Sequence, residues 1–217
     1  MRRVALSIVV LSAFAFAAGD ALAKAKAKPK GVSVTQSDIQ TCIGANGSSP
    51  KDQVTVCTKI INSGKVKPPY HGDYYALRGA AYYAMQDFEN ALADTDKAIT
   101  IRPKPETYFQ RALIHMALQK FEPAKADLAQ VMKQKPTFAP SYFMRGVISY
   151  DAGAYTEAVT YFDGAVQRLA TYYQAIYARG LAKKKAGDEA GGEKDIRTAR
   201  GMSSHVEKDM EKFGFKL

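Results

Sequence analysis

The chain has 217 residues and a net charge of +10. Without the export signal expected at residues 1–23, which contains two arginines and one aspartate, 194 residues and a charge of +9 remain, enough for one domain or one short repeat array. Without the four lysines that follow, the charge falls to +5, so the body is only mildly basic and does not resemble a nucleic-acid-binding protein.

Residues 1–23 are predicted to be a cleavable signal peptide. Arg2 and Arg3 precede an apolar run of 16 residues, Val4 to Gly19, and Ala21-Leu22-Ala23 provides the small residues that signal peptidase accepts. The run is short for a membrane span, although a retained anchor is the alternative. We expect cleavage after Ala23 and export, with a bacterial periplasm as the compartment.

Residues 24–34 are predicted to be a disordered basic arm. Lysines stand at every second position at its start, at Lys24, Lys26, Lys28 and Lys30, with almost no side chain to bury. Such a run is usually a solubilising tail. Weak contact with an anionic lipid or polymer surface is the alternative.

Residues 35–71 are predicted to form a helical hairpin that holds both cysteines. A first short helix spans residues 37–43, and Ser49 and Pro50 provide the cap and first residue of a second helix that runs to about Asn62. Cys42 and Cys57 fall on the two helices, and two cysteines in an exported chain usually form a disulfide. A metal site needs more ligands, and the three histidines fall in no metal-ligand spacing.

An internal repeat begins after this hairpin. An arginine followed by a small residue recurs at spacings of 33, 34 and 34 residues, at Arg78, Arg111, Arg145 and Arg179. Another small residue follows 12 positions later, at Ala91, Ala124, Ala158 and Gly192. Small residues at matched positions let two helices approach closely, and Pro103 and Pro136 end the second helix of the first two units.

These units resemble tetratricopeptide repeats from Gly72 to about Arg200. The resemblance implies an all-α fold, a right-handed superhelical stack of antiparallel helix pairs, with repeats at residues 72–105, 106–138 and 139–172. Residues 173–203 form a degenerate fourth repeat, because glycines stand where a helix favours alanine or leucine. Residues 204–217 are expected to form a capping helix, with a capping box from Ser204 to Glu207, over the exposed end of the stack, and a tail.

Aspartates recur 16 residues after three of the four arginines. This spacing predicts structural ion pairs between the two helices of a unit, Arg78 with Asp94, Arg111 with Asp127 and Arg179 with Asp195. Cys42 and Cys57 are 15 residues apart, so a disulfide is expected to replace the ion pair in the first hairpin. Tyr161 stands at the aspartate position after Arg145, which makes Arg145 the arginine expected to be available to an outside partner.

A second apolar stripe lies on the first helix of each repeat. In tetratricopeptide proteins this stripe lines the concave groove that receives a partner, so the resemblance implies a partner-binding groove at the following residues: Tyr83, Phe109, Leu113, Met116, Phe143, Val147, Tyr150, Tyr177, Leu181 and Lys184. The alternative is that these side chains pack against each other or against the chain's own ends. A peptide or helix with apolar or aromatic side chains suits such a groove.

Motifs for catalysis are not evident in the sequence. It contains no phosphate-binding glycine loop, no histidine pair on a helix face and no nucleophile elbow, so we expect neither enzyme activity, nor a cofactor, nor a metal. The predicted function is that of an adaptor or scaffold of the bacterial cell envelope, which binds a peptide or helix of another exported or membrane protein. The alternative function is association with an anionic envelope surface through the lysine arm.

Overall fold

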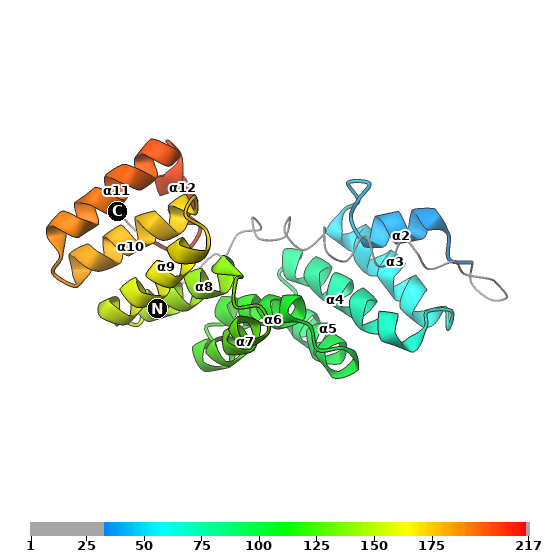
Figure 1. The fold of residues 1–217 in the computed structure, drawn as a ribbon. Coiled ribbons are helices and arrows are strands. Elements are labelled where there is room, and N and C mark those ends of the chain that lie inside the picture. The colour runs from blue at the N-terminus through cyan, green and yellow to red at the C-terminus, as the bar shows by residue number, and fades with distance from the viewer. Residues whose placement is uncertain (1–32, 216–217) are drawn as a thin grey trace. The chain divides into compact units, whose positions relative to one another are not determined.

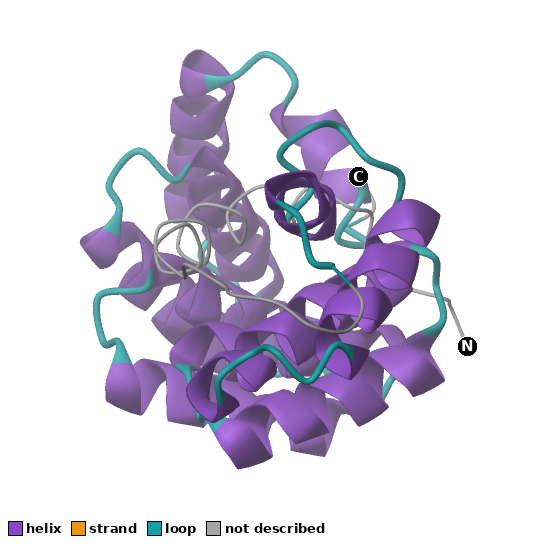
Figure 2. Ribbon diagram, turned by 90° about the vertical axis from the view of Figure 1, so that its right-hand side faces the viewer, coloured by secondary structure: helices purple, strands orange, loops and turns teal. Residues whose placement is uncertain are grey.

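The computed structural model describes residues 33–215, and every regular element in that range is an α-helix (Figure 2). Short loops join consecutive helices into antiparallel hairpins (Figure 1). This architecture confirms the all-α class. The helices are α2 (Gln36–Cys42), α3 (Pro50–Asn62), α4 (Pro68–Ala84), α5 (Phe88–Ile101), α6 (Pro105–Ala117), α7 (Phe121–Gln134), α8 (Ala139–Asp151), α9 (Tyr155–Arg168), α10 (Tyr173–Lys185), α11 (Glu189–Met202) and α12 (Val206–Glu211).

The chain divides into two compact units at the bond between Ile114 and His115, within α6. In the N-terminal unit, residues 33–114, α2 packs on α3, α3 on α4, and α4 on α5. In the C-terminal unit, residues 115–215, each helix from α7 to α11 packs on the next, and α12 packs on α10. The predicted signal peptide and most of the predicted lysine arm lie outside the described residues.

Local sequence signals set the helix ends. The Ser49 hydroxyl accepts a hydrogen bond from the Asp52 amide at the start of α3, as predicted. Helix α5 ends at Ile101 and α7 at Gln134, each two residues before a proline. The capping box predicted at Ser204 does not form: α12 begins at Val206 without a side-chain cap, and Glu207 binds Arg200 instead.

The turn inside each repeat contains one residue in the left-handed backbone region. These residues are Gln86 (φ 61°), Gln119 (φ 58°), Gly153 (φ 77°) and Gly187 (φ 98°), and they recur with the period of the repeat. Glycine adopts this conformation without steric cost, whereas other L-residues do so at about 1–2 kcal/mol. The same three-residue turn is therefore built four times, from glutamine twice and from glycine twice.

The fourth repeat is more regular than its glycine content predicts. Helices α10 and α11 are 13 and 14 residues long, like the helices of the other repeats. A Cβ atom added at Gly180 would lie 2.8 Å from the carbonyl oxygen of Gly192, so the two backbones are in direct contact. Gly192 therefore permits the closest approach of two helices in this hairpin, and it is not merely a weakened helix position.

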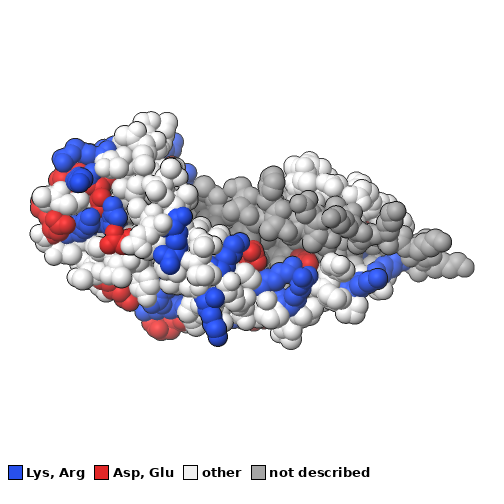
Figure 3. All heavy atoms as spheres, in the orientation of Figure 1, with Lys and Arg blue, Asp and Glu red and all other residues white. Residues whose placement is uncertain are grey.

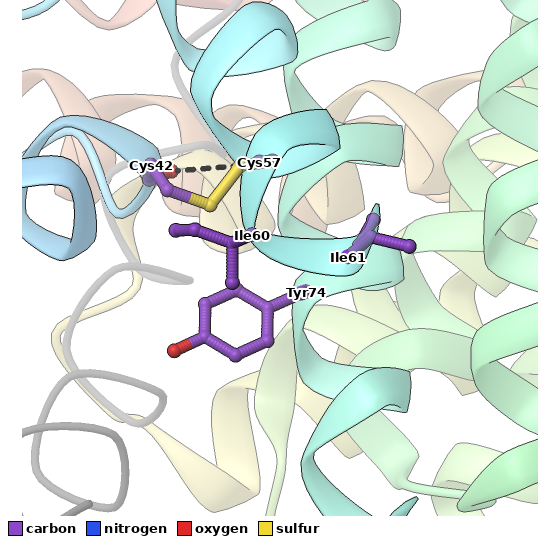
Figure 4. Packing of buried hydrophobic residues seen from close by; sticks show 5 residues of the cluster. All are labelled: Cys42, Cys57, Ile60, Ile61 and Tyr74. Carbon is purple, nitrogen blue, oxygen red and sulfur yellow. Dashed lines mark hydrogen bonds between the residues drawn. A yellow bond between two sulfur atoms is a disulfide. The ribbon is translucent and has the colours of Figure 1, made fainter. Parts of the chain in front are cut away.

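The first hairpin is closed by the predicted disulfide. Cys42 and Cys57 are bonded, with their Cα atoms 5.0 Å apart, and both are buried beside Ile60, Ile61 and Tyr74 (Figure 4). The dashed line in Figure 4 joins the Cys57 sulfur to the Cys42 carbonyl oxygen at 3.5 Å. A bonded sulfur carries no proton, so this approach is a van der Waals contact.

Two of the three predicted arginine–aspartate pairs are present. Arg78 donates two hydrogen bonds to Asp94, at 2.7 and 2.8 Å, and Arg179 donates two to Asp195, both at 2.7 Å. In both hairpins the guanidinium faces the carboxylate in the planar, bidentate arrangement that arginine favours. The hydrogen bonds that Arg78 donates to Asp94 raise the pKa of Arg78 above its usual value.

Arg111 and Asp127 lie in different units, so their pairing stays a prediction. Within its own unit, Arg111 forms an ion pair with Asp96 at 2.6 Å. Asp127 lies 3.8 Å from the His115 ring.

Arg145 is engaged within its own hairpin, which corrects the prediction that it is available to a partner. Its guanidinium donates a hydrogen bond to the Tyr161 hydroxyl at 2.6 Å and lies 4.7 Å from the centre of the Tyr161 ring. Glu157 lies 3.8 Å away, and only 16% of the Arg145 side chain is exposed. A phenol thus takes the place of the aspartate in the third repeat.

Candidate functional site: the first-helix surface

The first helices of the third and fourth repeats, α8 and α10, contribute six of the predicted groove residues, five aromatic or aliphatic ones and Lys184. Phe143, Val147 and Tyr177 are buried. Tyr150 and Leu181 are half-buried. The structure therefore brings these side chains to the predicted helices, and most of them are already covered.

Aromatic rings surround Phe143. Within the C-terminal unit its ring centre lies 5.7 Å from that of Phe162 on α9, 5.2 Å from Tyr172 and 5.1 Å from Phe213, which meets it edge-on at 83°. These distances and angles are those of favourable aromatic pairs. Burial raises the pKa of Tyr172 above its usual value.

Besides Phe213, the C-terminal segment contributes a second aromatic ring, that of Phe215. It lies 4.7 Å from Tyr150 and 6.3 Å from Phe162, measured between ring centres, and only 4% of it is exposed. Tyr150 also meets Tyr155 at 5.3 Å. Phe213 and Phe215 thus contact Phe143 and Tyr150, two predicted groove residues of α8, and Phe162 of α9, which sequence analysis did not single out.

Polar contacts fix the rest of this segment. The Tyr173 hydroxyl donates a hydrogen bond to Asp209 at 2.9 Å, and Arg200 donates one to Glu207 at 2.6 Å. The hydrogen bond from Lys212 to Asp209 is the main cause of the lowered pKa of Asp209. Between these contacts, Val206 and Met210 of α12 are buried.

The C-terminal segment, residues 203–215, therefore lies on the first-helix surface, which is the side of α8 and α10 that holds the predicted groove residues. Sequence analysis predicted that its helix caps the end of the stack; α12 packs on α10, the first helix of the last repeat, and the residues after it reach α8. The helix ends at Glu211, before Phe213, and Gly214 turns the chain with a φ of 79°. Sequence analysis did not single out Phe215; the signal that could have identified it is its spacing of two residues from Phe213.

The remaining groove residues lie on α4 and α6. Tyr83 of α4 is half-buried, and its ring centre lies 5.7 Å from that of Phe88. Phe109, Leu113 and Met116 of α6 are buried. These residues occupy the predicted helix positions, and their role as a partner-binding surface stays a prediction.

Lys184 forms ion pairs with two glutamates of α11. Its ammonium group lies 2.8 Å from Glu189 and 2.5 Å from Glu193, and the hydrogen bonds to these carboxylates raise the pKa of Lys184 to about 12. Positive and negative side chains are mixed over the α10–α11 hairpin, at the left of Figure 3. The positive charge of Lys184, a predicted groove residue, is therefore balanced within its own hairpin.

Neither a membrane-spanning helix nor a cluster of metal ligands occurs among residues 33–215. No helix there is both long enough and apolar enough to cross a bilayer. Nor do three or more His, Cys, Asp or Glu side chains gather there in a way that could hold a metal ion.

Stacked antiparallel hairpins, small-residue contacts and a recurrent left-handed turn define a helical-repeat protein. Residues 72–105 and 105–138 match the family model described as tetratricopeptide repeat. These matches and the architecture identify the chain as a tetratricopeptide-repeat protein.

Known proteins resemble this chain over different lengths. A stretch of 69 residues is 38% identical to serine/threonine-protein phosphatase 5 of Homo sapiens, which is 31% of this chain and 14% of the phosphatase. The same values hold for the Rattus norvegicus protein. The chain thus matches only a small part of these curated relatives.

Solved structures share the fold over most of the chain. A structure of MamA 41-end from Desulfovibrio magneticus RS-1 superposes with a TM-score of 0.67 at 13% identity, over 79% of this chain and 98% of that chain. YrrB, described as a TPR protein with an unusual peptide-binding site, superposes with a TM-score of 0.63 at 12% identity, over 91% of this chain and 99% of YrrB. At these identities the likeness establishes the fold alone.

Proposed function

We propose that this chain is a non-enzymatic interaction module of the bacterial cell envelope. It holds a peptide or helix of another exported or membrane protein against the first helices of its repeats. The tetratricopeptide fold typically serves binding rather than catalysis, which favours this function over an enzyme. The observation that carries the proposal is the seating of the chain's own residues 206–215, a short helix followed by two phenylalanines, on the first-helix surface of the C-terminal unit.

The physical argument concerns the kind of ligand that this surface accepts. Phe143, Tyr150 and Phe162 present ring faces and edges to an added peptide, and aromatic pairs contribute about 0.5–1.5 kcal/mol each beyond simple burial. A helix laid on a groove of this type is a recurring mode of peptide recognition. The proposed partner segment is therefore apolar and aromatic rather than strongly charged.

Export is part of the proposal and has two supports. The pattern of residues 1–23 is that of a cleavable signal, and the buried Cys42–Cys57 disulfide is typical of proteins that fold in an oxidising compartment. Cell fractionation with intact-mass measurement tests it: a periplasmic protein that begins at Lys24 is expected. A cytoplasmic protein that retains Met1 would contradict it.

Site-specific crosslinking in intact cells tests the binding function. A photo-reactive residue in place of the half-buried Leu181, on first helix α10, is expected to capture a second exported or membrane protein. The matched control replaces Thr198, which is exposed on second helix α11, and is expected to capture little. Equal capture at both positions, or none at position 181, would count against the proposed surface.

The alternative function is carried by residues outside the described part of the chain. Surface association through Lys24, Lys26, Lys28 and Lys30 predicts binding to anionic vesicles that weakens steeply with salt and disappears when residues 24–30 are deleted. Vesicle sedimentation of the mature protein measures this directly.

A further inference from the structure

The C-terminal segment, residues 203–215, is attached to the repeats as a ligand would be. It contains one helix of six residues, α12, which is too short to be stable in isolation. Its ordered conformation depends on side chains of the repeats. Phe143, Tyr150 and Phe162 form two aromatic sockets that hold Phe213 and Phe215. Tyr173 and Arg200 donate hydrogen bonds to the segment.

The sockets belong to the repeats. Phe143 and Tyr150 come from α8, and Phe162 comes from α9. Helices α8, α9 and α10 pack on one another in sequence, and Phe162 is held over Gly146, where an added Cβ atom would lie 2.5 Å from its ring. The repeat contacts alone therefore position Phe143 and Phe162, at 5.7 Å between ring centres. Removal of the segment would leave their ring surfaces open to another ligand.

The segment defines the chemistry of that ligand. Phe213 meets Phe143 edge-on, and Phe215 reaches Tyr150 and Phe162, so two rings separated by one residue fill two neighbouring sockets. The residue between them is Gly214, whose φ of 79° is readily adopted only by glycine and, less often, by asparagine or aspartate. An aromatic–glycine–aromatic sequence is therefore the simplest motif that reproduces both contacts.

We infer that the surface formed by Phe143, Tyr150 and Phe162 is a binding site for a partner peptide with an aromatic–glycine–aromatic motif. The chain's own residues 203–215 occupy this site and are displaced when such a peptide binds. This inference rests on the proposed binding function, and it adds the chemistry of the partner and the contact that controls access to the site.

Tethering explains how the segment regulates access. A ligand joined to its site by a short linker competes at an effective concentration of roughly millimolar. A free peptide of equal intrinsic affinity must overcome that competition, so its apparent affinity falls by the fraction of time for which the site is closed. Weakening the segment's own contacts should therefore strengthen the binding of a free peptide.

The first experiment measures the binding of a fluorescent peptide of residues 204–215 to the full chain. The double variant F213A/F215A is expected to bind this probe at least tenfold more tightly than the unaltered chain. A probe with both phenylalanines replaced by alanine is expected to bind neither protein. The matched control L169A changes an exposed residue at the end of α9 and should bind the probe as the unaltered chain does. Equal probe affinity of F213A/F215A and the unaltered chain would overturn the inference.

A second variant keeps the test valid if loss of two aromatic side chains disturbs folding. E207Q/D209N weakens the hydrogen bonds that Arg200 and Tyr173 donate to these two carboxylates but retains both phenylalanines. An increase in probe affinity of about threefold is expected, smaller than that of the double alanine variant because the rings still compete. No increase, in a variant with unchanged circular dichroism, would contradict displacement.

Hydrogen exchange tests displacement in the unaltered chain. Saturating probe is expected to speed exchange of the chain's own amides in residues 206–213, while exchange in α8 is unchanged or slower. Unchanged exchange in residues 206–213 would overturn the inference. Sedimentation velocity covers the remaining alternative: a dimer that F213A/F215A converts to a monomer would show that the segment binds a second copy, which also contradicts it.

The two proposals can fail separately. If crosslinking at position 181 captures a partner in cells but F213A/F215A does not bind the probe more tightly, the proposed function stands and this inference falls. If the probe behaves as expected and position 181 captures no partner, the site exists but the proposed cellular function is wrong.

Discussion

The α2–α3 and α4–α5 hairpins join their two helices at almost the same spacing by different chemistry. Cys42 and Cys57 are 15 residues apart, and Arg78 and Asp94 are 16 apart. The disulfide brings Cα atoms to within 5.0 Å without placing any charge in the interior, whereas the ion pair spans the helices with a long side chain and requires both charges to stay paired. The repeat architecture therefore needs a link at this position, and several kinds of bond can provide it.

The third repeat extends the comparison to a neutral acceptor. Arg145 binds the Tyr161 hydroxyl where Arg78 and Arg179 bind aspartate. In the fourth repeat, burial tends to raise the pKa of Asp195, but hydrogen bonds from Arg179 and Lys183 outweigh it and leave that pKa below its usual value. Covalent, ionic and neutral links thus occur in one chain, and their strengths can be compared by substitution.

Removal of the disulfide should have the largest effect. The variant C42A/C57A is expected to lower the free energy of unfolding of the N-terminal unit by about 3 kcal/mol, because the closed loop restricts the unfolded chain. Urea unfolding followed by circular dichroism measures it. Dithiothreitol should destabilise the unaltered chain to a similar extent and leave the variant unchanged; sensitivity of the variant to the reductant would contradict this explanation.

Removal of one partner of the ion pair should have the next largest effect. Asp94→Ala is expected to cost about 2–3 kcal/mol, since it leaves the Arg78 guanidinium, 14% exposed, without its carboxylate. Replacement of both partners, Arg78→Met with Asp94→Leu, should cost less than the single change because no unpaired charge remains. Thermal unfolding of the three proteins decides the point, and a double variant less stable than Asp94→Ala would refute it.

Loss of the neutral link should have a smaller effect. Tyr161→Phe removes the acceptor of the Arg145 hydrogen bond but keeps the ring beneath the guanidinium, so a loss of about 1 kcal/mol is expected. Tyr142→Phe is the matched control. Arg168 lies 3.5 Å from the centre of that ring and contacts its face, so stability should not change. Equal losses in the two variants would show that the hydroxyl of Tyr161 is not the relevant group.

The smallest predicted effect is a gain. Asp87 and Asp188 cap α5 and α11 by accepting hydrogen bonds from the amides of Asn90 and Gly191, whereas Ala154, in a similar backbone conformation at the start of α9, cannot. Ala154→Asp is expected to stabilise the C-terminal unit by about 1 kcal/mol. Thermal unfolding measures it, with Ala154→Gly as the control that adds no acceptor. A decrease for the aspartate variant would contradict the capping argument.

The repeat fold could be predicted from sequence because it depends on local, periodic signals. The spacing of the arginines and small residues predicted the hairpins, and the spacing of 16 predicted the pairs of Arg78 with Asp94 and Arg179 with Asp195. The contact of Arg145 with Tyr161 was not predicted, although Tyr161 stands at the aspartate position and its hydroxyl can accept a hydrogen bond.

Sequence analysis gave packing of the groove residues against the chain's own ends as the alternative, but it could not predict which residues cover them. Phe213 and Phe215 have no place in the 34-residue pattern, and their contacts with α8 depend on where the chain turns after α11. The small-residue pattern predicted that Gly192 permits close helix approach, and its contact with Gly180 confirms this, whereas the helix propensity of glycine alone indicated only a weakened helix. Helix propensity counts the cost of glycine within one helix, whereas the contact of Gly192 with Gly180 is a property of two helices.

The left-handed turn at Gln86, Gln119, Gly153 and Gly187 fixes the rotation of the second helix about its own axis. One additional residue in that turn would rotate every side chain of the following helix by about 100°, given 3.6 residues per helical turn. Asp94 would then point away from Arg78, and Asp195 away from Arg179. The length of these turns therefore cannot drift freely, even though they are exposed, because each one sets the phase on which its link between helices depends.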